Sequence, residues 1–336
     1  MAIGLAGGGL ASLIGTPLPW MLGPMIATAL VALLGAPVVG PARLRPFIIP
    51  VLGVLLGSGV TPETIGQLGS WALTLAVLPL FLAVAGVISY TVYRRIGGYD
   101  RTTAFYSAMP GGLNEMLLLG AEAGGNERQI AMAHASRVML VIVFVALFFG
   151  LFLGMSSNGE TASRWIAVDD ITLRDYVILG LCAVAGYMLG KRLGLPAAPI
   201  LGPMILSAAT HVTGFVTVAP PTLLVIAAQL TIGTIIGTRF LGATMQEIRR
   251  DMGLSLVATF LMLIVAVAFA EGIYLASAIP LTQGFLAYAP GGLAEMSLLA
   301  IAMDQDATYV SSMHIVRITI VIAIAPLVFK AFSRRS

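Results

Sequence analysis

Two acidic side chains stand in apolar sequence, each shortly after a proline and two glycines. Residues 108–120 read AMPGGLNEMLLLG, and residues 289–300 read APGGLAEMSLLA. The carboxylates are Glu115 and Glu295. A carboxylate in apolar surroundings takes up a proton, or binds a cation, more readily than one in water. The alternative interpretation is structural, because a glutamate in the first turn caps its own helix or pairs with an arginine.

The second repeated pattern is a histidine followed three residues later by an arginine. It occurs as His134 and Arg137 in HASR and as His314 and Arg317 in HIVR, and this spacing puts both side chains on one face of a helix. An unpaired arginine near the middle of a membrane costs at least ~3 kcal/mol. Its partner is either the glutamate of the same half or an oxyanion of a bound solute. The histidines are either hydrogen-bonded structural groups or proton carriers.

The Pro-Gly-Gly triplets are predicted to break helices inside the apolar segments. Proline has no N–H and glycine disfavours helix, so backbone N–H and C=O groups become free there. Such groups survive at membrane depth only inside the protein or beside a wet cavity. A half-helix that begins after the glycines points its N–H groups at that cavity and favours an anion. No metal is predicted at this site. The other residues predicted to line it are Gly111, Gly112, Asn114, Gly291 and Gly292.

The composition indicates that these groups belong to a membrane protein. Of the 336 residues, 58% are hydrophobic and 10% are charged, whereas a soluble domain carries roughly 25% charged residues. Apolar runs of about 20 residues recur along the chain, and this length crosses a hydrocarbon core. The single cysteine, Cys182, excludes a disulfide framework within the chain.

The chain repeats itself. LGPM at residues 22–25 returns 179 residues later at 201–204, and the two motifs described above return 180 residues later. Such phase-locked matches indicate a duplication. We therefore predict a first membrane repeat over residues 1–155, an extracytoplasmic linker over 156–174 and an inverted second repeat over 175–336. A glycine spacing that favours close helix packing also recurs, at Gly53 and Gly57 and at Gly233 and Gly237.

Each half is predicted to contain five membrane-spanning helices and one broken segment. The predicted spans of the first half cover residues 2–15, 19–37, 47–61, 71–93 and 129–153. Those of the second half cover residues 175–190, 196–214, 221–239, 252–275 and 308–330. The broken segments lie before the last span of each half, at 102–121 and 282–303.

The placement of basic residues indicates that the broken segments do not cross the membrane. If each enters and returns on the same side, most of the 18 lysines and arginines fall on the cytoplasmic side, as the positive-inside rule requires. If they crossed, the basic cluster at 94–101 or the one at 239–251 would lie on the wrong side. Five crossings in each half then make the second half enter the membrane upside down. Both termini are predicted to be cytoplasmic.

The predicted fold is an all-α polytopic membrane protein with an inverted-topology internal repeat. Each half has five transmembrane helices plus one re-entrant broken hairpin, and the two breaks meet near the middle of the bilayer. Elevator-type transporters are built in this way, but this comparison rests on fold-level analogy.

At the paired PGG-L-x-E-M and H-x-x-R motifs the chain resembles the AbrB family of bacterial membrane proteins, over essentially its whole length. The resemblance implies a duplicated protein, and we expect it in the bacterial inner membrane. Family members carry two conflicting labels, regulator of aidB expression and ammonia monooxygenase. A copper oxygenase needs a cluster of imidazoles, but the chain has three histidines, two of them in opposite halves. Direct DNA binding needs a soluble basic module, but the longest loop is acidic.

We therefore expect neither an enzyme nor a nucleic-acid partner. Because the sequence has no Walker A, Rossmann or zinc motif, the expected activity is gradient-driven secondary transport by alternating access. The expected solute is a small, carboxylate-like anion bound by Arg137 or Arg317, with Glu115 and Glu295 taking H⁺ or Na⁺ as the coupling ion. Two alternatives stay open: transport of an amine or cation, and a membrane sensor that affects gene expression indirectly. No cofactor is expected; the partners are the solute, the lipid bilayer and, as an open option, a second copy of the chain.

Overall fold

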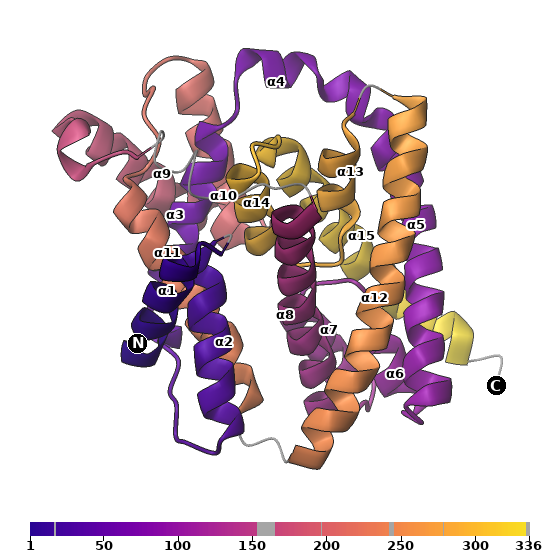
Figure 1. The fold of residues 1–336 in the computed structure, drawn as a ribbon. Helices are drawn as coiled ribbons and strands as arrows, with labels where there is room; N and C mark the ends of the chain where they lie inside the picture. The colour runs from indigo at the N-terminus through magenta and orange to yellow at the C-terminus, as the bar shows by residue number, and fades with distance from the viewer. Residues whose placement is uncertain (17, 153–164, 196, 242–244, 278, 334–336) are drawn as a thin grey trace. The chain divides into compact units, whose positions relative to one another are not determined.

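The computed structural model describes residues 1–16, 18–152, 165–195, 197–241, 245–277 and 279–333 (Figure 1). These residues form helices and connecting segments and contain no strand, so the prediction of an all-α protein is confirmed. Residues 156–164 of the predicted linker lie outside the described residues, and so do the C-terminal Arg334 and Arg335.

The two halves contain the same series of helices. The first half has α1 (Ala2–Ile14), α2 (Pro19–Leu33), α3 (Arg45–Ser58), α5 (Ala72–Thr91), α6 (Arg101–Ala108), α7 (Leu113–Glu122) and α8 (Glu127–Phe152). The second half has α9 (Leu173–Arg192), α10 (Ala198–Val212), α11 (Thr222–Gly237), α12 (Met245–Ala276), α13 (Leu281–Tyr288), α14 (Leu293–Ala302) and α15 (Ala307–Ser333). The shorter elements are α4 (Pro62–Gly66), the 3₁₀ turns η1 (Ala42–Leu44), η2 (Leu68–Trp71), η4 (Val168–Asp170) and η5 (Thr238–Phe240), and the π-helical turn η3 (Val92–Ile96).

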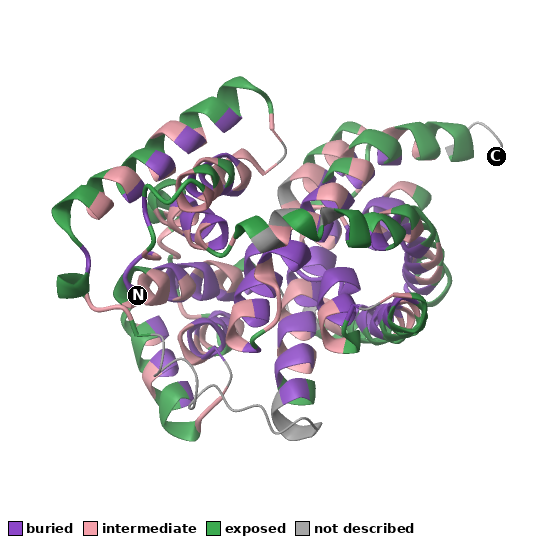
Figure 2. Cartoon of the chain, turned by 90° about the horizontal axis from the view of Figure 1, so that it is seen from above, coloured by how far each residue is buried: buried purple, intermediate pink, exposed green. Residues whose placement is uncertain are grey.

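The lengths and composition of the helices are those of a multi-pass membrane protein. Within the described residues, six are long and apolar enough to cross a membrane: Gly69–Ile96, Glu127–Phe149, Leu173–Arg192, Thr222–Phe240, Arg249–Ala276 and Ala307–Phe332. Their apolar side chains are widely exposed, for example Leu80 (60%), Phe260 (55%) and Leu327 (67%), and exposed residues recur along many helices (Figure 2).

Four of the ten predicted spans are too short for a complete crossing. Helices α1, α2, α3 and α10 contain 13, 15, 14 and 15 residues. At 1.5 Å per residue they reach about 20–23 Å, less than the ~30 Å of a hydrocarbon core. Five complete crossings in each half therefore stay a prediction.

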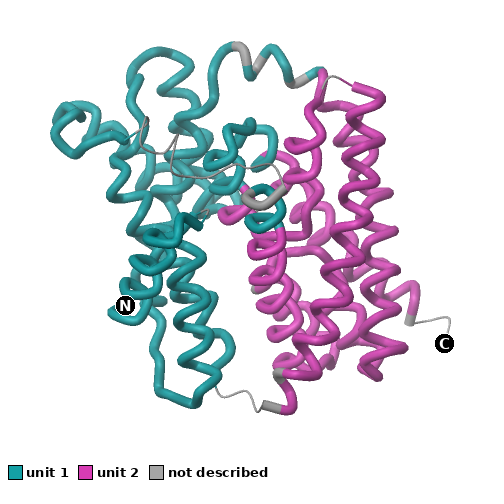
Figure 3. The backbone as a smooth tube through the Cα atoms, viewed as in Figure 1, with its two compact units in different colours: residues 1–69, 145–241, 297–311 teal, residues 70–144, 242–296, 312–336 magenta. Residues whose placement is uncertain are grey.

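The chain forms two compact units, and each unit takes corresponding helices from both halves (Figure 3). Unit 1 contains α1, α2 and α3 together with their counterparts α9, α10 and α11, whereas unit 2 contains α5, α6 and α7 together with α12, α13 and most of α15. Both Pro-Gly-Gly breaks lie in unit 2. The units comprise residues 1–69, 145–241 and 297–311, and residues 70–144, 242–296 and 312–336.

Close backbone contacts at glycines hold unit 1 together. A Cβ on either glycine of the α3 pair would overlap a backbone carbonyl of α10, and a Cβ on either glycine of the α11 pair would overlap a carbonyl of α2. The facing residues are Gly53 and Ile200, Gly57 and Met204, Gly233 and Met21, and Gly237 and Met25. The close packing that the glycine spacing predicts is confirmed, and each contact joins one half of the chain to the other.

In unit 2 the corresponding helices α5 and α12 run antiparallel. Tyr99, which follows η3, donates its hydroxyl to Oδ1 of Asp251 near the start of α12 at 2.7 Å, and Arg250 donates to the carbonyl oxygen of Gly97. Burial and the hydrogen bond to Asp251 raise the pKa of the Tyr99 hydroxyl well above its ordinary value, so it stays a donor. The end of α5 is thereby tied to the start of α12.

Aromatic packing positions the end of α13 within unit 2. The ring of Tyr288 lies 5.0 Å from that of Phe81 on α5 and 5.9 Å from that of Phe269 on α12, measured between centroids. Its hydroxyl donates to the carbonyl oxygen of Thr74 at 2.9 Å. Since α13 ends at Tyr288, these contacts hold the segment that leads into the second break.

We expect Gly233→Ala to destabilise the protein by about 1–3 kcal/mol, because the new methyl group would overlap a backbone carbonyl of α2 that cannot move alone. The measurement is the unfolding temperature of the purified chain in detergent. The matched control is Gly180→Ala on α9, where an added Cβ meets nothing within 4 Å; it should be neutral or stabilising by up to about 1 kcal/mol. Equal effects of the two substitutions would contradict the close contact.

Candidate functional site

The Pro-Gly-Gly segments break their helices as predicted. Helix α6 ends at Ala108 and α7 begins at Leu113, while α13 ends at Tyr288 and α14 begins at Leu293. Between them the backbone is extended, with φ −63° and ψ 127° at Met109. Each break therefore exposes carbonyl oxygens at the end of one half-helix and N–H groups at the start of the next.

Asp100 starts the first half-helix. Its carboxylate accepts a hydrogen bond from the backbone N–H of Thr103 at 2.9 Å, which caps α6. Burial would raise the pKa of Asp100, but the hydrogen bonds from Thr103, from Thr102 and from its own backbone N–H together outweigh burial and hold the pKa below its ordinary value. The cap therefore contributes stability above the ordinary pKa of an aspartate, and this contribution is lost as the pH falls through the lowered value.

Arg137, which lies on α8, binds the carbonyl oxygens of the first break. Its Nη1 donates to the carbonyl oxygen of Met109 at 3.0 Å, and Nη2 approaches that of Gly111 at 3.5 Å. Only 4% of the arginine is exposed. A cation at the carbonyl end of a half-helix satisfies the orphan acceptors and interacts favourably with the helix dipole.

Arg317 makes the same contacts at the second break. Its Nη1 donates to the carbonyl oxygen of Ala289 at 2.7 Å and its Nη2 to that of Gly291 at 2.5 Å, and the arginine is 2% exposed. The hydrogen bonds of both arginines, within the described residues, go to carbonyl oxygens and one imidazole. Neither arginine forms an ion pair with a glutamate within the described residues; the carbonyl oxygens of the breaks are their acceptors instead.

Each histidine donates a hydrogen bond to a carbonyl oxygen of the half-helix before the break, one turn before the carbonyl that the arginine binds. Nε2–H of His134 donates to Tyr106 at 2.9 Å, and its Nδ1 accepts from Arg137 at 2.8 Å. These partners require a neutral ring with its proton on Nε2, which favours the structural interpretation. Nε2–H of His314 donates to Leu286 at 3.0 Å, but its buried Nδ1 has no hydrogen-bond partner among the described residues.

The glutamates lie at the N-termini of the second half-helices. Gly112 is the N-cap of α7, and Glu115 is the third residue of that helix. A Cβ on Gly112 would overlap Oε2 of Glu115, and a Cβ on Gly292 would overlap Oε2 of Glu295. The second glycine of each motif thus leaves room for a carboxylate that folds back over its helix N-terminus, where the helix dipole favours negative charge.

The first glycine of each motif makes room for the methionine that ends it. A Cβ on Gly111 would come within 3.0 Å of the Met116 side chain, and one on Gly291 would come within 2.7 Å of Met296. Both methionines are fully buried. The two glycines, the glutamate and the methionine of PGG-L-x-E-M thereby have local structural roles. The side chain of Asn114 lies outside the described residues.

Two buried hydroxyls lie beside the site although sequence reasoning did not single them out. Ser107 lies on α6 two residues before Met109, and Ser136 precedes Arg137 on α8. Both hydroxyl oxygens are buried and lack a hydrogen-bond partner among the described residues, as do Nε of Arg137 and Nε of Arg317. A small polar residue beside a motif arginine is the sequence signal that marks Ser136.

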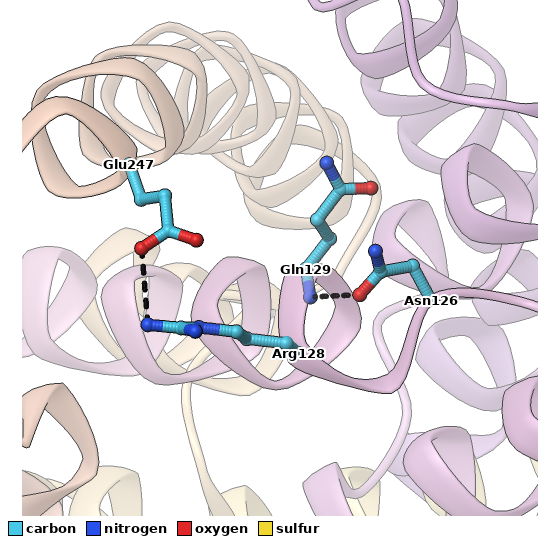
Figure 4. Close-up of polar contacts among 4 residues, drawn as sticks. All are labelled: Asn126, Arg128, Gln129 and Glu247. Atoms are coloured by element: carbon cyan, nitrogen blue, oxygen red, sulfur yellow. Dashed lines mark hydrogen bonds and ion pairs between the residues drawn. The ribbon is translucent and has the colours of Figure 1, made fainter. Parts of the chain in front are cut away.

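An ion pair and a cap position the start of α8 (Figure 4). Oδ1 of Asn126 accepts from the backbone N–H of Gln129 at 3.1 Å, and Nη2 of Arg128 lies 3.0 Å from Oε2 of Glu247 on α12. Both charged side chains are substantially exposed, so the pair contributes little stability. It does bring the start of α8 beside the start of α12 within unit 2.

Comparison with known proteins assigns the chain to a family. A family model described as transition state regulatory protein AbrB matches residues 20–333. The chain belongs to the AbrB family. Its similarity to "Uncharacterized protein YhjN" of Bacillus subtilis (strain 168) is 27% identity over 97% of this chain and 90% of that protein. "Putative regulator AbrB" of Escherichia coli (strain K12) is 24% identical over 94% of this chain and 90% of its own length. The resemblance to AbrB that the motifs predicted is confirmed.

We expect Arg317→Lys to destabilise this AbrB-family chain by about 2 kcal/mol or more, because one ammonium group cannot reproduce the fork that reaches two carbonyl oxygens. Thermal unfolding in detergent measures the loss. The control, Arg192→Lys, makes the same substitution at the exposed end of α9, where the arginine has no such contacts among the described residues. It should leave the unfolding temperature unchanged. If both variants unfold like the parent, the arginine does not hold the break.

Proposed function

We propose that this AbrB-family membrane protein is a gradient-driven secondary transporter of a small, carboxylate-like anion, which binds between the two helix breaks of unit 2. The observation that carries the proposal is a pair of buried guanidinium groups that form no ion pair within the described residues. Arg137 and Arg317 are almost inaccessible, and they interact electrostatically with each other. Two like charges in a low-dielectric interior are costly unless an anion joins them.

Carbonyl hydrogen bonds orient the arginines but do not neutralise them. Each guanidinium keeps one buried N–H, on Nε, without a hydrogen-bond partner in the described part of the chain. A carboxylate bound there would supply both the missing acceptor and the missing charge. The unpartnered hydroxyl of Ser107 and the free Nδ1 of His314 offer further polar contacts to such a solute.

The glutamates are suited to couple solute binding to an ion gradient. Glu115 and Glu295 occupy the N-termini of α7 and α14, where an anionic solute would also be favoured. A proton or Na⁺ taken up by the carboxylates would remove their repulsion of the solute. The coupling ion would thereby load the site together with the anion, and both would be released together.

Helix directions support the inverted topology that this proposal needs. The corresponding helices α5 and α12 run antiparallel, and so do α3 and α11, because Gly40 before α3 lies beside Thr238 after α11. Arg128 and Glu247 bring the start of α8 and the start of α12 to one side of unit 2. This arrangement supports re-entrant breaks, and the positive-inside rule then favours cytoplasmic basic clusters. The proposal includes an inner-membrane location with both termini in the cytoplasm.

A regulatory role is the second candidate, because the relative from Escherichia coli is named a regulator. In this alternative the protein senses a solute and moves none. It shares the anion site with the transporter but predicts no flux, so a transport assay separates the two.

We expect one class of small anions to stabilise the detergent-purified chain and to enter proteoliposomes that contain it. A ligand that binds only the folded state at a hundredfold excess over its Kd adds ~2.7 kcal/mol. The panel consists of carboxylates, inorganic phosphate, amines and Na⁺ at two pH values. Arg137→Gln and Arg317→Gln should abolish the stabilisation by the anion, and Glu115→Gln with Glu295→Gln should remove the pH or Na⁺ dependence of uptake.

Arg192→Gln, an exposed substitution on α9, is the control and should leave both the stabilisation and the uptake unchanged. Stabilisation by amines that is lost in the glutamate variants would overturn the anion assignment in favour of amine transport. Anion binding without uptake under any gradient would favour the regulator.

A further inference from the structure

An apolar groove crosses one face of unit 2. It has a volume of about 320 Å³ and lies between α5, α6 and α15. On α5 it extends from Pro79 to Tyr90, which corresponds to about 16 Å of helical rise. Its walls are open, since Val87 is 66% exposed and Val328 is 46% exposed. An open, apolar groove of this length on a membrane-embedded unit can accommodate a lipid acyl chain.

Aromatic rings close one end of the groove. Tyr90 at the end of α5 packs edge-to-face against Phe332 of α15, with ring centroids 5.7 Å apart. Phe105 of α6 packs against Phe329 of α15 at 5.3 Å. Tyrosine gathers where the hydrocarbon core meets the headgroup layer, and Tyr90 lies near the end of the apolar span Gly69–Ile96. The aromatic end of the groove is therefore its end at the membrane surface.

Two arginines follow directly beyond this aromatic end. Arg94 lies in the π-helical turn η3, four residues after Tyr90, and Arg101 lies four residues before Phe105, one α-helical turn away on α6. Both side chains are exposed. Arg94 uses Nη1 to donate to the carbonyl oxygen of Tyr99 at 2.6 Å, which leaves its other N–H groups for a ligand.

We propose that this groove binds an anionic phospholipid, with one acyl chain between α5, α6 and α15 and the phosphate at Arg94 and Arg101. The apolar walls account for the chain and the two guanidinium groups for the charge. A zwitterionic lipid of the same chain length fills the groove but lacks the net negative charge that the arginines favour. The site is separate from the buried arginines of the helix breaks.

The lipid would also stabilise the first helix break. Met109 lines the groove with its side chain, while its carbonyl oxygen accepts the hydrogen bond from Arg137. Val321 lines the groove from α15 and faces Gly111 of the break. An acyl chain packed on these two residues holds the break in the conformation that Arg137 binds, and loss of the lipid loosens it.

The test is native mass spectrometry of the full chain in detergent with dioleoylphosphatidylglycerol or dioleoylphosphatidylcholine, which have the same acyl chains. We expect the wild-type protein to prefer phosphatidylglycerol. Arg94→Gln with Arg101→Gln should weaken its binding about thirtyfold, because each arginine near an anionic lipid contributes a factor of about five. Binding of phosphatidylcholine should weaken less, because its choline cation offsets the charge of the phosphate. Ala83→Trp, placed on the exposed groove wall of α5, should weaken the binding of both lipids.

The controls are Leu80→Trp, on the same helix outside the groove and 60% exposed, and Lys191→Gln with Arg192→Gln at the end of α9. Both should bind phosphatidylglycerol like the wild type. Equal wild-type affinity for the two lipids, or unchanged binding in Ala83→Trp, would overturn the proposal. A change from dimer to monomer in Ala83→Trp would also overturn it, since the groove would then be an interface between copies. Circular dichroism and the unfolding temperature check that each variant is folded.

Discussion

The rest of unit 2 depends on how the protein satisfies the carbonyl oxygens that its own prolines and glycines set free. Each break interrupts a helix in apolar surroundings, where an unpaired carbonyl costs several kcal/mol. A buried guanidinium from the last helix of the same half supplies two donors to two of these oxygens. The arginine can be buried because it has these acceptors, and the break can persist because it has the arginine.

This mutual dependence leaves each arginine without a counterion among the residues that the structure describes. Hydrogen bonds to neutral carbonyl oxygens satisfy the N–H groups, but they cannot cancel a positive charge in a low-dielectric interior. The glutamates that accompany the breaks fold back over their own helix N-termini, which the second glycine of each motif permits. Most residues of the motif therefore have structural roles. In the described part of the chain, two buried cations with one unpartnered N–H each remain, and they are the basis of the proposed anion site.

The division into units follows from duplication and from small residues. Helices α3 and α11 each place a pair of glycines against the backbone of a helix from the other half. Such contacts need both halves, so neither repeat forms its own compact unit. Both breaks lie in unit 2, where aromatic packing and the Tyr99–Asp251 hydrogen bond join α5 to α12. The close glycine contacts thus lie in unit 1 and the helix breaks in unit 2.

The sequence by itself determined the helical membrane class, the duplication, the position of both breaks and the AbrB resemblance, because hydropathy, proline and glycine act locally and repeat at a constant spacing. It also marked the residues of the motifs. It could not choose the partner of Arg137, because a glutamate and a carbonyl oxygen are equally available to a guanidinium until the fold sets the distances. The units and the groove between α5, α6 and α15 likewise arise from contacts between residues far apart in the chain. Only the tertiary structure decides these, since periodicity records which face of a helix is apolar but not which helix it meets.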